Sequence, residues 1–328
     1  YLGTAYFQSG RTAEAVTTLA DFEKQYPDSL LLRDARVLYG SALLAANRAK
    51  DAIAVLEKDR QPPRADLELA LGKAYAAAGE PAKAADILRN LYVTMPLSAE
   101  ASQADVELKQ LASTTQLPPV GLNGRRTRAD LLAKGRRFSD AAGEYRDLLS
   151  VVSPSDRPEI QMALAVSLRR SGDDKEAKKV LDAMQIPAGS EINTQRIFNL
   201  GEIARSDNDE QGFLQYLGQL RQAAPTSFWL QQALLSEGNY YLLEPDYDKA
   251  IDAYRELEQR FPNAARASYA HWKVAWLSLR QDRTAEAKTG FEQQIGLYPT
   301  SAEVPAALYW RGRLAEEDKD PAMARAYY

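Results

Sequence analysis

"LGTAYFQSGRTAEAVTTLADFEKQYP", residues 2–27, recurs in similar form as "LGKAYAAAGEPAKAADILRNLYVTMP", residues 71–96. The two segments share five positions at a constant separation of 69 residues: Gly3 and Gly72, Tyr6 and Tyr75, Gly10 and Gly79, Ala15 and Ala84, and Pro27 and Pro96. A constant separation over the whole segment indicates an internal repeat. The fold therefore depends on how this repeat is built and how often it occurs.

Each copy carries a small residue near its start, and the copies can be counted by it. The small residue recurs at Gly3, Gly40, Gly72, Ala129, Ala165, Gly201, Gly238, Ala275 and Gly312. Successive members are 37, 32, 57, 36, 36, 37, 37 and 37 residues apart. We therefore expect about nine units, with one insertion in the gap of 57 residues.

The second half of each unit has the apolar spacing of an α-helix. Apolar residues fall at i, i+4 and i+7, which is one side of a helix with 3.6 residues per turn. Examples are Ala15/Leu19/Phe22, Ala84/Leu88/Leu91, Ala141/Tyr145/Leu148, Ala177/Leu181/Met184, Phe213/Leu217/Leu220 and Ala250/Tyr254/Leu257. Prolines that end a helix follow at Pro27, Pro96, Pro225, Pro262 and Pro299. No segment alternates as a strand would, so the expected fold is all-α.

This unit resembles the tetratricopeptide repeat, a helix–turn–helix of about 34 residues. The resemblance implies a solenoid of helical hairpins wound as a right-handed superhelix. In that family the first helix of each hairpin lines the concave surface. The composition agrees with a globular protein, with 26% charged and 45% hydrophobic residues.

The insertion suggests how the chain is divided. "SAEASQADVELKQL" (98–111) can form an extra helix, and "ASTTQLPPVGLNG" (112–124) has the turn residues of a linker. We expect N-terminal tetratricopeptide-like repeats over 1–97, an extra helix and linker over 98–124, and a superhelical repeat domain over 125–328. The ninth unit lacks the end of its second helix, so we expect the domain to be truncated there and the protein to be longer.

The residue types exclude several kinds of chemistry. The chain has no cysteine and one histidine, His271, which removes cysteine-based metal sites and paired-histidine sites and makes a Ser-His-Asp triad improbable. His271 has no acidic partner at ligand spacing, so we expect an ordinary surface or half-buried residue. No glycine-rich phosphate loop is present, and no cofactor or metal is expected. The absence of cysteine weakly favours an oxidising compartment such as the periplasm.

A second resemblance concerns "AHWKVAWLSLRQDRTAEAKTGFEQQIGLYPTSAEVPAALYWRGRLAEEDKDPAMARAYY", residues 270–328. It is similar to the superhelical region that precedes the catalytic domain of soluble lytic murein transglycosylases, and residues 117–149 resemble the start of that region. The matching residues are Trp272, Ala275, Trp276, Tyr309, Trp310, Gly312, Arg313, Ala324, Tyr327 and Tyr328. The Glu-Ser motif of the catalytic domain does not occur in the chain, so no catalytic residue is carried over and the chain itself is not expected to be an enzyme.

Two functions stay open from the sequence. The resemblance implies a non-catalytic periplasmic scaffold that positions peptidoglycan strands or a C-terminal catalytic domain. The alternative is a cell-envelope adaptor that binds a peptide or protein partner in its concave groove, since repeat folds serve many partners. Neither function involves nucleic acid or a transmembrane segment.

Two candidate sites follow from the register. Side chains of the first helices, which the family places on the concave surface, form the candidate groove: Arg169, Arg170, Glu202, Arg205, Asn239, Trp272, Trp276, Arg280, Tyr309 and Arg313. Aromatic residues at this spacing can instead be packing residues. The candidate basic patch for an anionic partner is Arg125, Arg126, Arg128, Lys134, Arg136 and Arg137, with a solvated helix start as the alternative. The acidic run Glu316, Glu317, Asp318 and Asp320 is expected to be an exposed turn.

Overall fold

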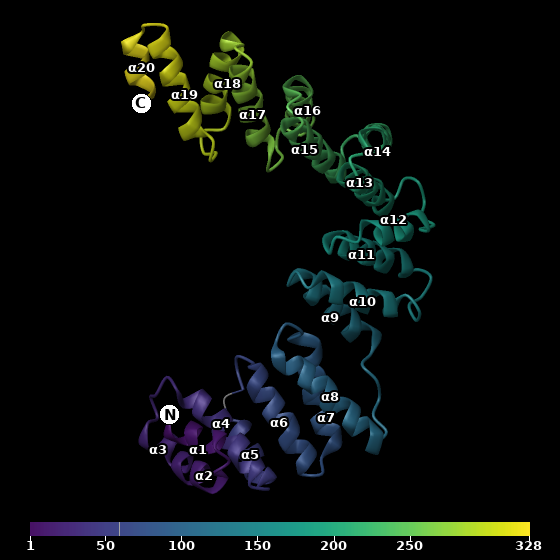
Figure 1. Ribbon diagram of the computed structural model, residues 1–328, viewed down its shortest axis with the longest axis vertical. Helices are drawn as coiled ribbons and strands as arrows, with labels where there is room; N and C mark the ends of the chain where they lie inside the picture. The colour runs from purple at the N-terminus through teal and green to yellow at the C-terminus, as the bar shows by residue number, and fades with distance from the viewer. Residues whose placement is uncertain (59) are drawn as a thin grey trace. The chain divides into compact units, whose positions relative to one another are not determined.

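The computed structural model describes residues 1–58 and 60–328, and no strand is found among them. Figure 1 shows helices following one another in antiparallel pairs. The first eleven are α1 (Leu2–Gln8), α2 (Thr12–Ala20), α3 (Phe22–Gln25), α4 (Leu32–Ala45), α5 (Ala49–Leu56), α6 (Ala65–Ala77), α7 (Pro81–Thr94), α8 (Ala99–Thr114), α9 (Leu122–Lys134), α10 (Phe138–Leu148) and α11 (Arg157–Arg170). The others are α12 (Asp174–Asp182), α13 (Glu191–Ser206), α14 (Glu210–Ala223), α15 (Phe228–Leu243), α16 (Tyr247–Arg260), α17 (Ala267–Arg280), α18 (Thr284–Leu297), α19 (Val304–Glu317) and α20 (Pro321–Tyr327). The prediction of an all-α helical-hairpin solenoid is confirmed.

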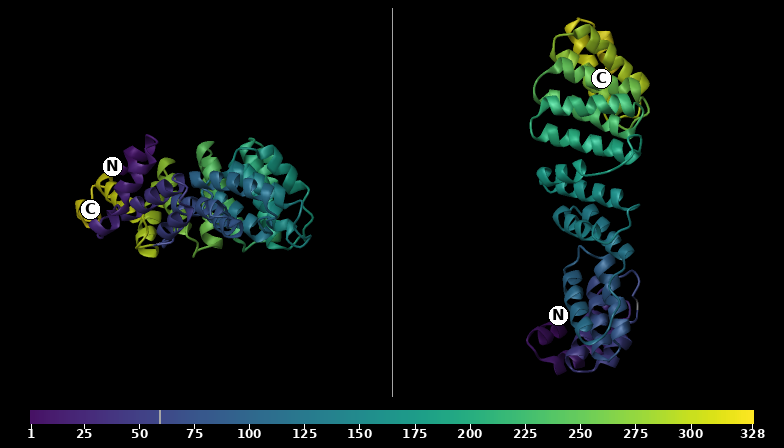
Figure 2. Two further views of the ribbon diagram at one scale, coloured as in Figure 1. Left: turned by 90° about the horizontal axis from the view of Figure 1, so that it is seen from below. Right: turned by 90° about the vertical axis from the view of Figure 1, so that its right-hand side faces the viewer.

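The described residues divide into two compact units, residues 1–173 and residues 174–328. Within each unit the helices of successive hairpins lie side by side, as the right panel of Figure 2 shows. In the second unit α16 packs against α17 and α18 packs against α19, so each hairpin contacts the next one along the chain. The division into residues 1–97, 98–124 and 125–328 stays a prediction.

One backbone hydrogen bond recurs at the turn of every hairpin and fixes the number of units. In each turn an N–H group donates to the carbonyl oxygen five residues earlier, over 2.8–3.0 Å. The nine donor and acceptor pairs in the described residues are Arg11 and Tyr6, Arg48 and Leu43, Glu80 and Tyr75, Arg137 and Leu132, Asp173 and Leu168, Asp209 and Ala204, Asp246 and Tyr241, Arg283 and Ser278, and Asp320 and Ala315. Each donor lies eight residues after the small residue of its unit. The predicted register of nine units is therefore confirmed.

The turn needs a left-handed residue just before that N–H donor, as at the end of many helices. Gly79 fills this position with φ +77°, and Asn47 and Asp282 fill it with φ 59° each. Pro245 occupies the same place in the α15–α16 turn, although its ring fixes φ at a negative value. The hydrogen bond from Asp246 to Tyr241 still forms at 3.0 Å there, so the turn tolerates a second backbone form.

Small residues allow the two helices of a hairpin to touch. A methyl group added at Gly40 would lie 2.5 Å from Leu56, and one added at Gly238 would lie 2.6 Å from the ring of Tyr254. The predicted apolar triples of the second helices are buried, except for the half-buried Phe22. Close helix approach thus explains the glycines at Gly40 and Gly238, whereas at Gly201 the nearest side-chain atom lies at 3.4 Å.

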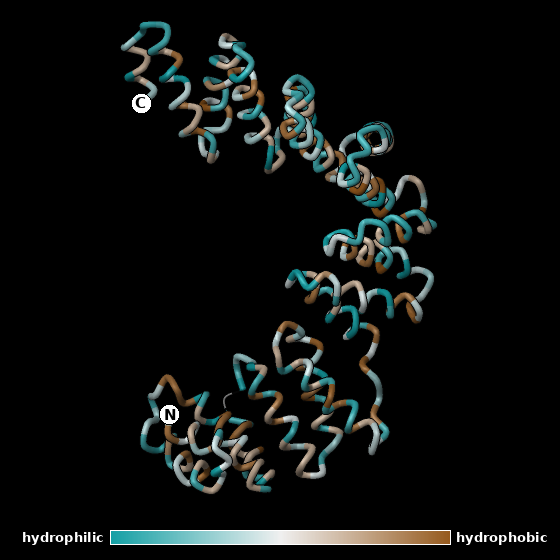
Figure 3. Tube along the Cα trace, viewed as in Figure 1, coloured by the Kyte–Doolittle hydropathy of each residue, from teal (hydrophilic) through white to brown (hydrophobic). Residues whose placement is uncertain are grey.

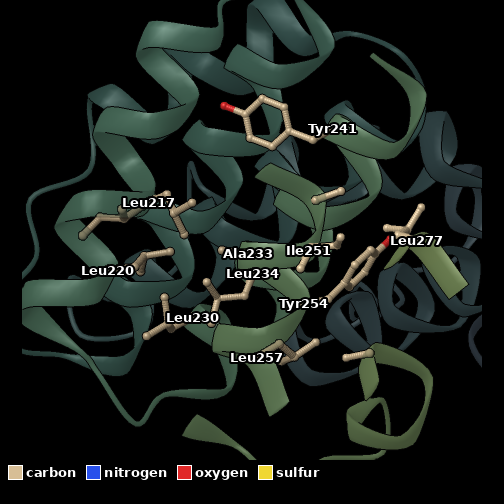
Figure 4. Close-up of a cluster of buried hydrophobic side chains, with 13 residues drawn as sticks. Leu217, Leu220, Leu230, Ala233, Leu234, Tyr241, Ile251, Tyr254, Leu257 and Leu277 are labelled. Carbon is tan, nitrogen blue, oxygen red and sulfur yellow. The ribbon is translucent and has the colours of Figure 1, made fainter. Parts of the chain in front are cut away.

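The core of the second unit lies between neighbouring hairpins. Figure 4 shows Leu220, Leu230, Leu234 and Leu257 gathered between the helices α14, α15 and α16. Tyr254 is fully buried in the same cluster, and its hydroxyl donates to Oδ1 of Asn239 over 2.8 Å. Burying such side chains contributes about 1.5–3 kcal/mol each. Each hairpin therefore depends on its neighbour for stability.

The predicted extra helix exists as α8, which packs against α7 in the first unit. Ala104 of α8 joins a buried cluster with Leu69, Leu88 and Leu91. The insertion therefore extends the stack of helices locally. Figure 3 shows hydrophobic and hydrophilic residues interspersed along the helices. No helix in the described parts of the chain combines the length and apolar character that crossing a membrane requires.

Candidate functional site

The ten candidate groove residues all lie on first helices of hairpins, but they belong to both units. Arg169 and Arg170 lie on α11 of the first unit. The other eight lie in the second unit, and we call them the first-helix face: Glu202, Arg205, Asn239, Trp272, Trp276, Arg280, Tyr309 and Arg313. The site is described for these eight residues of one unit.

Aromatic residues of the first-helix face meet in a cluster that joins α17 to α19. The rings of Trp272 and Trp276 are stacked, with centroids 6.0 Å apart and an interplanar angle of 4°. Trp276 lies 4.9 Å from the ring of Trp310, which lies 5.3 Å from the ring of Tyr309. Aromatic pairs at such distances attract one another beyond their hydrophobic contact. The structure therefore unites side chains that the sequence separates by more than thirty residues.

The tryptophans of this cluster also pack against the hydrophobic core. Trp272, Trp276 and Trp310 are half-buried and pack against a buried cluster that includes Ala275 and Phe291. The indole N–H of Trp272 is buried and has no hydrogen-bond partner in the described part of the chain. Tyr309 is 50% exposed. The tryptophans thus hold the two hairpins together, and Tyr309 presents the aromatic surface to solvent.

Polar members of the first-helix face are held by neighbours to different degrees. Arg205 pairs with Glu202 over 3.1 Å, and Glu202 also accepts a hydrogen bond from the hydroxyl of Ser236. Arg313 pairs with Glu316 over 2.9 Å at a solvent-exposed position. Arg280 is exposed, and its side chain forms no hydrogen bond or ion pair with residues 1–58 and 60–328. Exposed ion pairs contribute little stability, so Arg313 can exchange its partner at low cost, and Arg280 has no ion pair with the described residues to give up.

The candidate basic patch lies on α9 and its following turn, where acidic side chains of the first unit occupy most of it. Arg126 pairs with Glu159 over 2.8 Å, which raises the pKa of Arg126. Arg128 pairs with Glu144 over 2.8 Å and lies 3.7 Å over the ring of Tyr92. The other pairs are Arg137 with Asp140 at 2.5 Å and Arg125 with Asp147 at 3.9 Å. Lys134 and Arg136 are exposed at the end of α9. Four of the six residues therefore form ion pairs within the unit, and the role of the patch as an anion site stays a prediction.

The acidic run near the end of the chain lies at an exposed turn. Asp320 caps α20 by accepting a hydrogen bond from the N–H of Met323 over 3.0 Å, with Pro321 in the first turn. Asp318 pairs with Lys288 over 2.5 Å, and Glu316 pairs with Arg313. Among the described residues, no group of three or more His, Cys, Asp or Glu side chains is placed to hold a metal ion.

The expectation for His271 is wrong. His271 is only 7% exposed, and its Nδ1 lies 2.8 Å from Oε1 of Glu258. Its Nε2 lies 3.1 Å from the carbonyl oxygen of Gly290. The acidic partner lies 13 residues earlier on the preceding hairpin, so no local spacing could reveal it.

The sequence analysis also missed ion pairs between neighbouring hairpins, whose two residues are about one repeat length apart in the sequence. Arg221 pairs with Glu237 and with Glu256, 35 residues later, each over 2.7 Å. Glu237 is buried, and burial raises its pKa although the charge of Arg221 opposes this. Searching for opposite charges one repeat apart would have found the pair of Arg221 and Glu256.

Comparison with known proteins confirms the repeats. Residues 2–65 and 126–191 match a family model described as tetratricopeptide repeat. Residues 230–326 match a model described as YfiO, an outer membrane lipoprotein. The chain therefore contains tetratricopeptide repeats, and a stretch that spans nearly all of α15–α20 is similar to that lipoprotein.

Two curated relatives carry the name outer membrane protein assembly factor BamD. The protein of Neisseria gonorrhoeae is 27% identical over 123 residues, which cover 33% of this chain and 46% of the relative. The protein of Neisseria meningitidis serogroup A has the same identity and coverage. The chain thus spans about half the length of the curated relatives it matches.

Among solved structures, the C-terminal part of a tetratricopeptide repeat-containing protein from Cytophaga hutchinsonii aligns with a TM-score of 0.45 and 13% identity. The alignment covers 83% of this chain and 99% of that one. The expected likeness to lytic transglycosylases finds no support in these matches and stays a prediction.

Proposed function

We propose that the chain is a protein-interaction adaptor of the cell envelope, and that the first-helix face binds its protein partner. The observation that carries the proposal is the match of residues 230–326 to the outer membrane lipoprotein model. This stretch holds six of the eight residues of the first-helix face, from Asn239 to Arg313. The relatives named for outer membrane protein assembly point to the same compartment.

The chemistry of the face suits a protein partner. Tyr, Trp and Arg are the residues most enriched at the centres of protein interfaces. Here an exposed Tyr309 stands beside Trp310 and near a rigid pair of stacked tryptophans, so little side-chain entropy would be lost on binding. Arg280 and Arg313 add charged donors that a carboxylate or a backbone carbonyl could accept from.

The proposal assigns no reaction to the chain. Neither matched family description names an enzyme. A role at the glycan, as the transglycosylase likeness implied, would need affinity for peptidoglycan. That affinity separates the two functions experimentally.

The test compares two double variants of the full chain that carry the same change of charge. Arg280→Glu with Arg313→Glu alters the first-helix face, whereas Lys175→Glu with Arg325→Glu alters exposed positions on the second helices α12 and α20. Affinity capture from detergent-solubilised envelopes should recover one stoichiometric protein with the unaltered chain and with the control. The face variant should recover at least tenfold less of it.

Cosedimentation with purified sacculi is the second arm of the test. The proposal expects no more sedimentation than for an unrelated protein. Saturable sedimentation that the face variant abolishes, together with capture of no protein, would replace the adaptor function by the glycan scaffold.

A further inference from the structure

His271 links three helices through hydrogen bonds at both of its ring nitrogens. The ring lies on α17, its Nδ1 faces Oε1 of Glu258 on α16 at 2.8 Å, and its Nε2 faces the carbonyl oxygen of Gly290 on α18 at 3.1 Å. Gly290 lies close to α17, since a methyl group added there would meet Cβ of Ala275 at 2.6 Å. The ring is therefore held at the junction of two hairpins.

Both partners of the ring are hydrogen-bond acceptors. A carboxylate accepts only, and so does a backbone carbonyl oxygen. A neutral imidazole has one N–H donor and one acceptor nitrogen, so it can satisfy only one of these partners. The imidazolium has two donors and satisfies both. Loss of one proton would leave a nitrogen lone pair facing an oxygen lone pair in a buried place, which is costly.

The other charged and titratable groups around His271 do not replace this link. A cavity of about 660 Å³ beside the ring is lined by Arg255 and Glu258 from α16 and by Glu286 from α18. Arg255 faces Glu286 at 3.5 Å, and Glu286 also accepts from the hydroxyl of Ser278 over 3.2 Å. Tyr298, at the end of α18, donates to Oε1 of Glu258 over 3.4 Å. Glu258 is thus the only carboxylate shown in contact with the ring among the described residues.

We propose that His271 is a protonation switch that clamps α16, α17 and α18 together while its ring carries two N–H groups and loosens the junction of the two hairpins when one is lost. The inference does not depend on the adaptor function. It concerns the contact between the hairpins α15–α16 and α17–α18, which also positions Trp272 and Trp276 on α17.

The pKa of the ring supports this geometry. Burial lowers the pKa of His271, but the hydrogen bond and charge of Glu258 and the carbonyl of Gly290 outweigh burial, so the pKa is raised above the ordinary value of 6.5. A group whose pKa is raised by folding stabilises the fold fully below the pKa of the unfolded chain. That stability is lost as the pH rises through the folded pKa. The clamp is therefore closed below pH 6.5 and opens as the pH rises through the raised pKa of the ring.

The chain offers a direct readout because it contains one histidine. Nitrogen-detected NMR of the full chain gives the protonation state of that ring without any assignment step. We expect both ring nitrogens to be protonated at pH 6.5 and the ring to titrate above pH 6.5. A ring that titrates at or below pH 6.5 in the folded protein, or that carries a single N–H at pH 6, would overturn the proposal.

Glu258→Gln tests the partner and Glu68→Gln is its matched control. Glu258→Gln removes the negative charge that stabilises the imidazolium. The acid dissociation constant of the ring should therefore rise at least tenfold, so that the ring titrates at least one pH unit lower. Glu68 is a buried carboxylate of the first unit that pairs with Arg60, and its variant should leave the histidine titration unchanged. An unchanged titration in Glu258→Gln would refute the clamp.

Thermal unfolding measures how much the hydrogen bonds of His271 stabilise the fold. Between pH 6 and 8.5 the melting temperature of the unaltered chain should fall, because the stability that the raised pKa of His271 confers is lost as the pH rises through that pKa. His271→Gln cannot titrate and should lose this pH dependence. Equal pH dependence in both proteins would show that the ring does not act as a switch. If His271→Gln does not fold, the NMR titration of the unaltered chain still decides.

Discussion

The hairpins α6–α7 and α17–α18 place a buried polar residue at the same point of the repeat and use it differently. Glu68 lies four residues before the small residue Gly72, and His271 lies four residues before Ala275. Glu68 is paired with Arg60 through two hydrogen bonds of 3.1 and 2.7 Å. Glu68 raises the pKa of the Arg60 guanidinium above its already high usual value, so the cation of this pair is retained at any ordinary pH. The link of His271 with Glu258 can lose its proton as the pH rises through the raised pKa of the ring.

The register of a repeat determines where a buried polar residue can occur. The residue type then determines whether its contact is permanent or depends on pH. An arginine–carboxylate pair is a permanent connection. A histidine at the equivalent place makes a connection that depends on pH. Variants of the permanent pair and of the packing and turn residues of the register test this difference.

Removing the permanent partner should have the largest effect. Arg60→Ala leaves the carboxylate of Glu68, which is 2% exposed, without its cation. Breaking a buried pair on one side costs about 3 kcal/mol of unfolding free energy. Urea denaturation at pH 6 and at pH 8.5 should give the same loss, because the Arg60 guanidinium that the variant removes is protonated at both. A loss confined to one pH would contradict the comparison.

Replacing Gly238, the small packing residue of the hairpin α15–α16, should cause the second largest loss of stability. Gly238→Ala places a methyl group 2.6 Å from the ring of Tyr254, which is fully buried and fixed by its bond to Asn239. Overpacking of this kind costs about 1–2 kcal/mol after the gain in helix propensity. Gly201→Ala is the control, since its nearest neighbour lies at 3.4 Å. Equal stability of the two variants would show that close approach does not set the register.

The turn residue gives a smaller effect. Gly79→Ala forces a side chain into a backbone with φ +77° and should cost about 1 kcal/mol. Gly143→Ala in the interior of α10 meets nothing within 4 Å and should raise stability by about 0.5–1 kcal/mol. Chemical denaturation should show that the free energy of unfolding falls in Gly79→Ala and rises in Gly143→Ala. Destabilisation by Gly143→Ala would mean that glycine is needed in α10 for a reason other than helix formation.

Much of the fold could be predicted from the sequence because short-range chemistry determines it. Gly10 and Gly79 mark turns, Gly40 and Gly238 mark close contacts, and the apolar triples mark the buried sides of second helices. These signals act within one hairpin of about 35 residues. The count of nine units therefore follows from local patterns.

The partners of the polar residues could not be predicted, because they lie on other hairpins. Glu258 reaches His271 only through the packing of α16 on α17, and Glu159 reaches Arg126 from the next hairpin. Helical spacing placed Trp272 and Trp276 on one side of a helix, but their contact with Trp310 depends on how α17 and α19 pack. In the basic patch the partner of Arg126 is Glu159, which lies 33 residues later, whereas Arg137 pairs with Asp140 only three residues away. The role of the patch as an anion site stays a prediction.

Site-specific photo-crosslinking in the organism that makes the protein tests the adaptor account most directly. A photoreactive phenylalanine analogue would replace Arg280 or Tyr309 on the first-helix face, or Arg325 on α20 as the control. The account predicts one and the same envelope protein joined covalently at both face positions and absent at Arg325. Adducts of equal yield at all three positions, or none at the face, would contradict it.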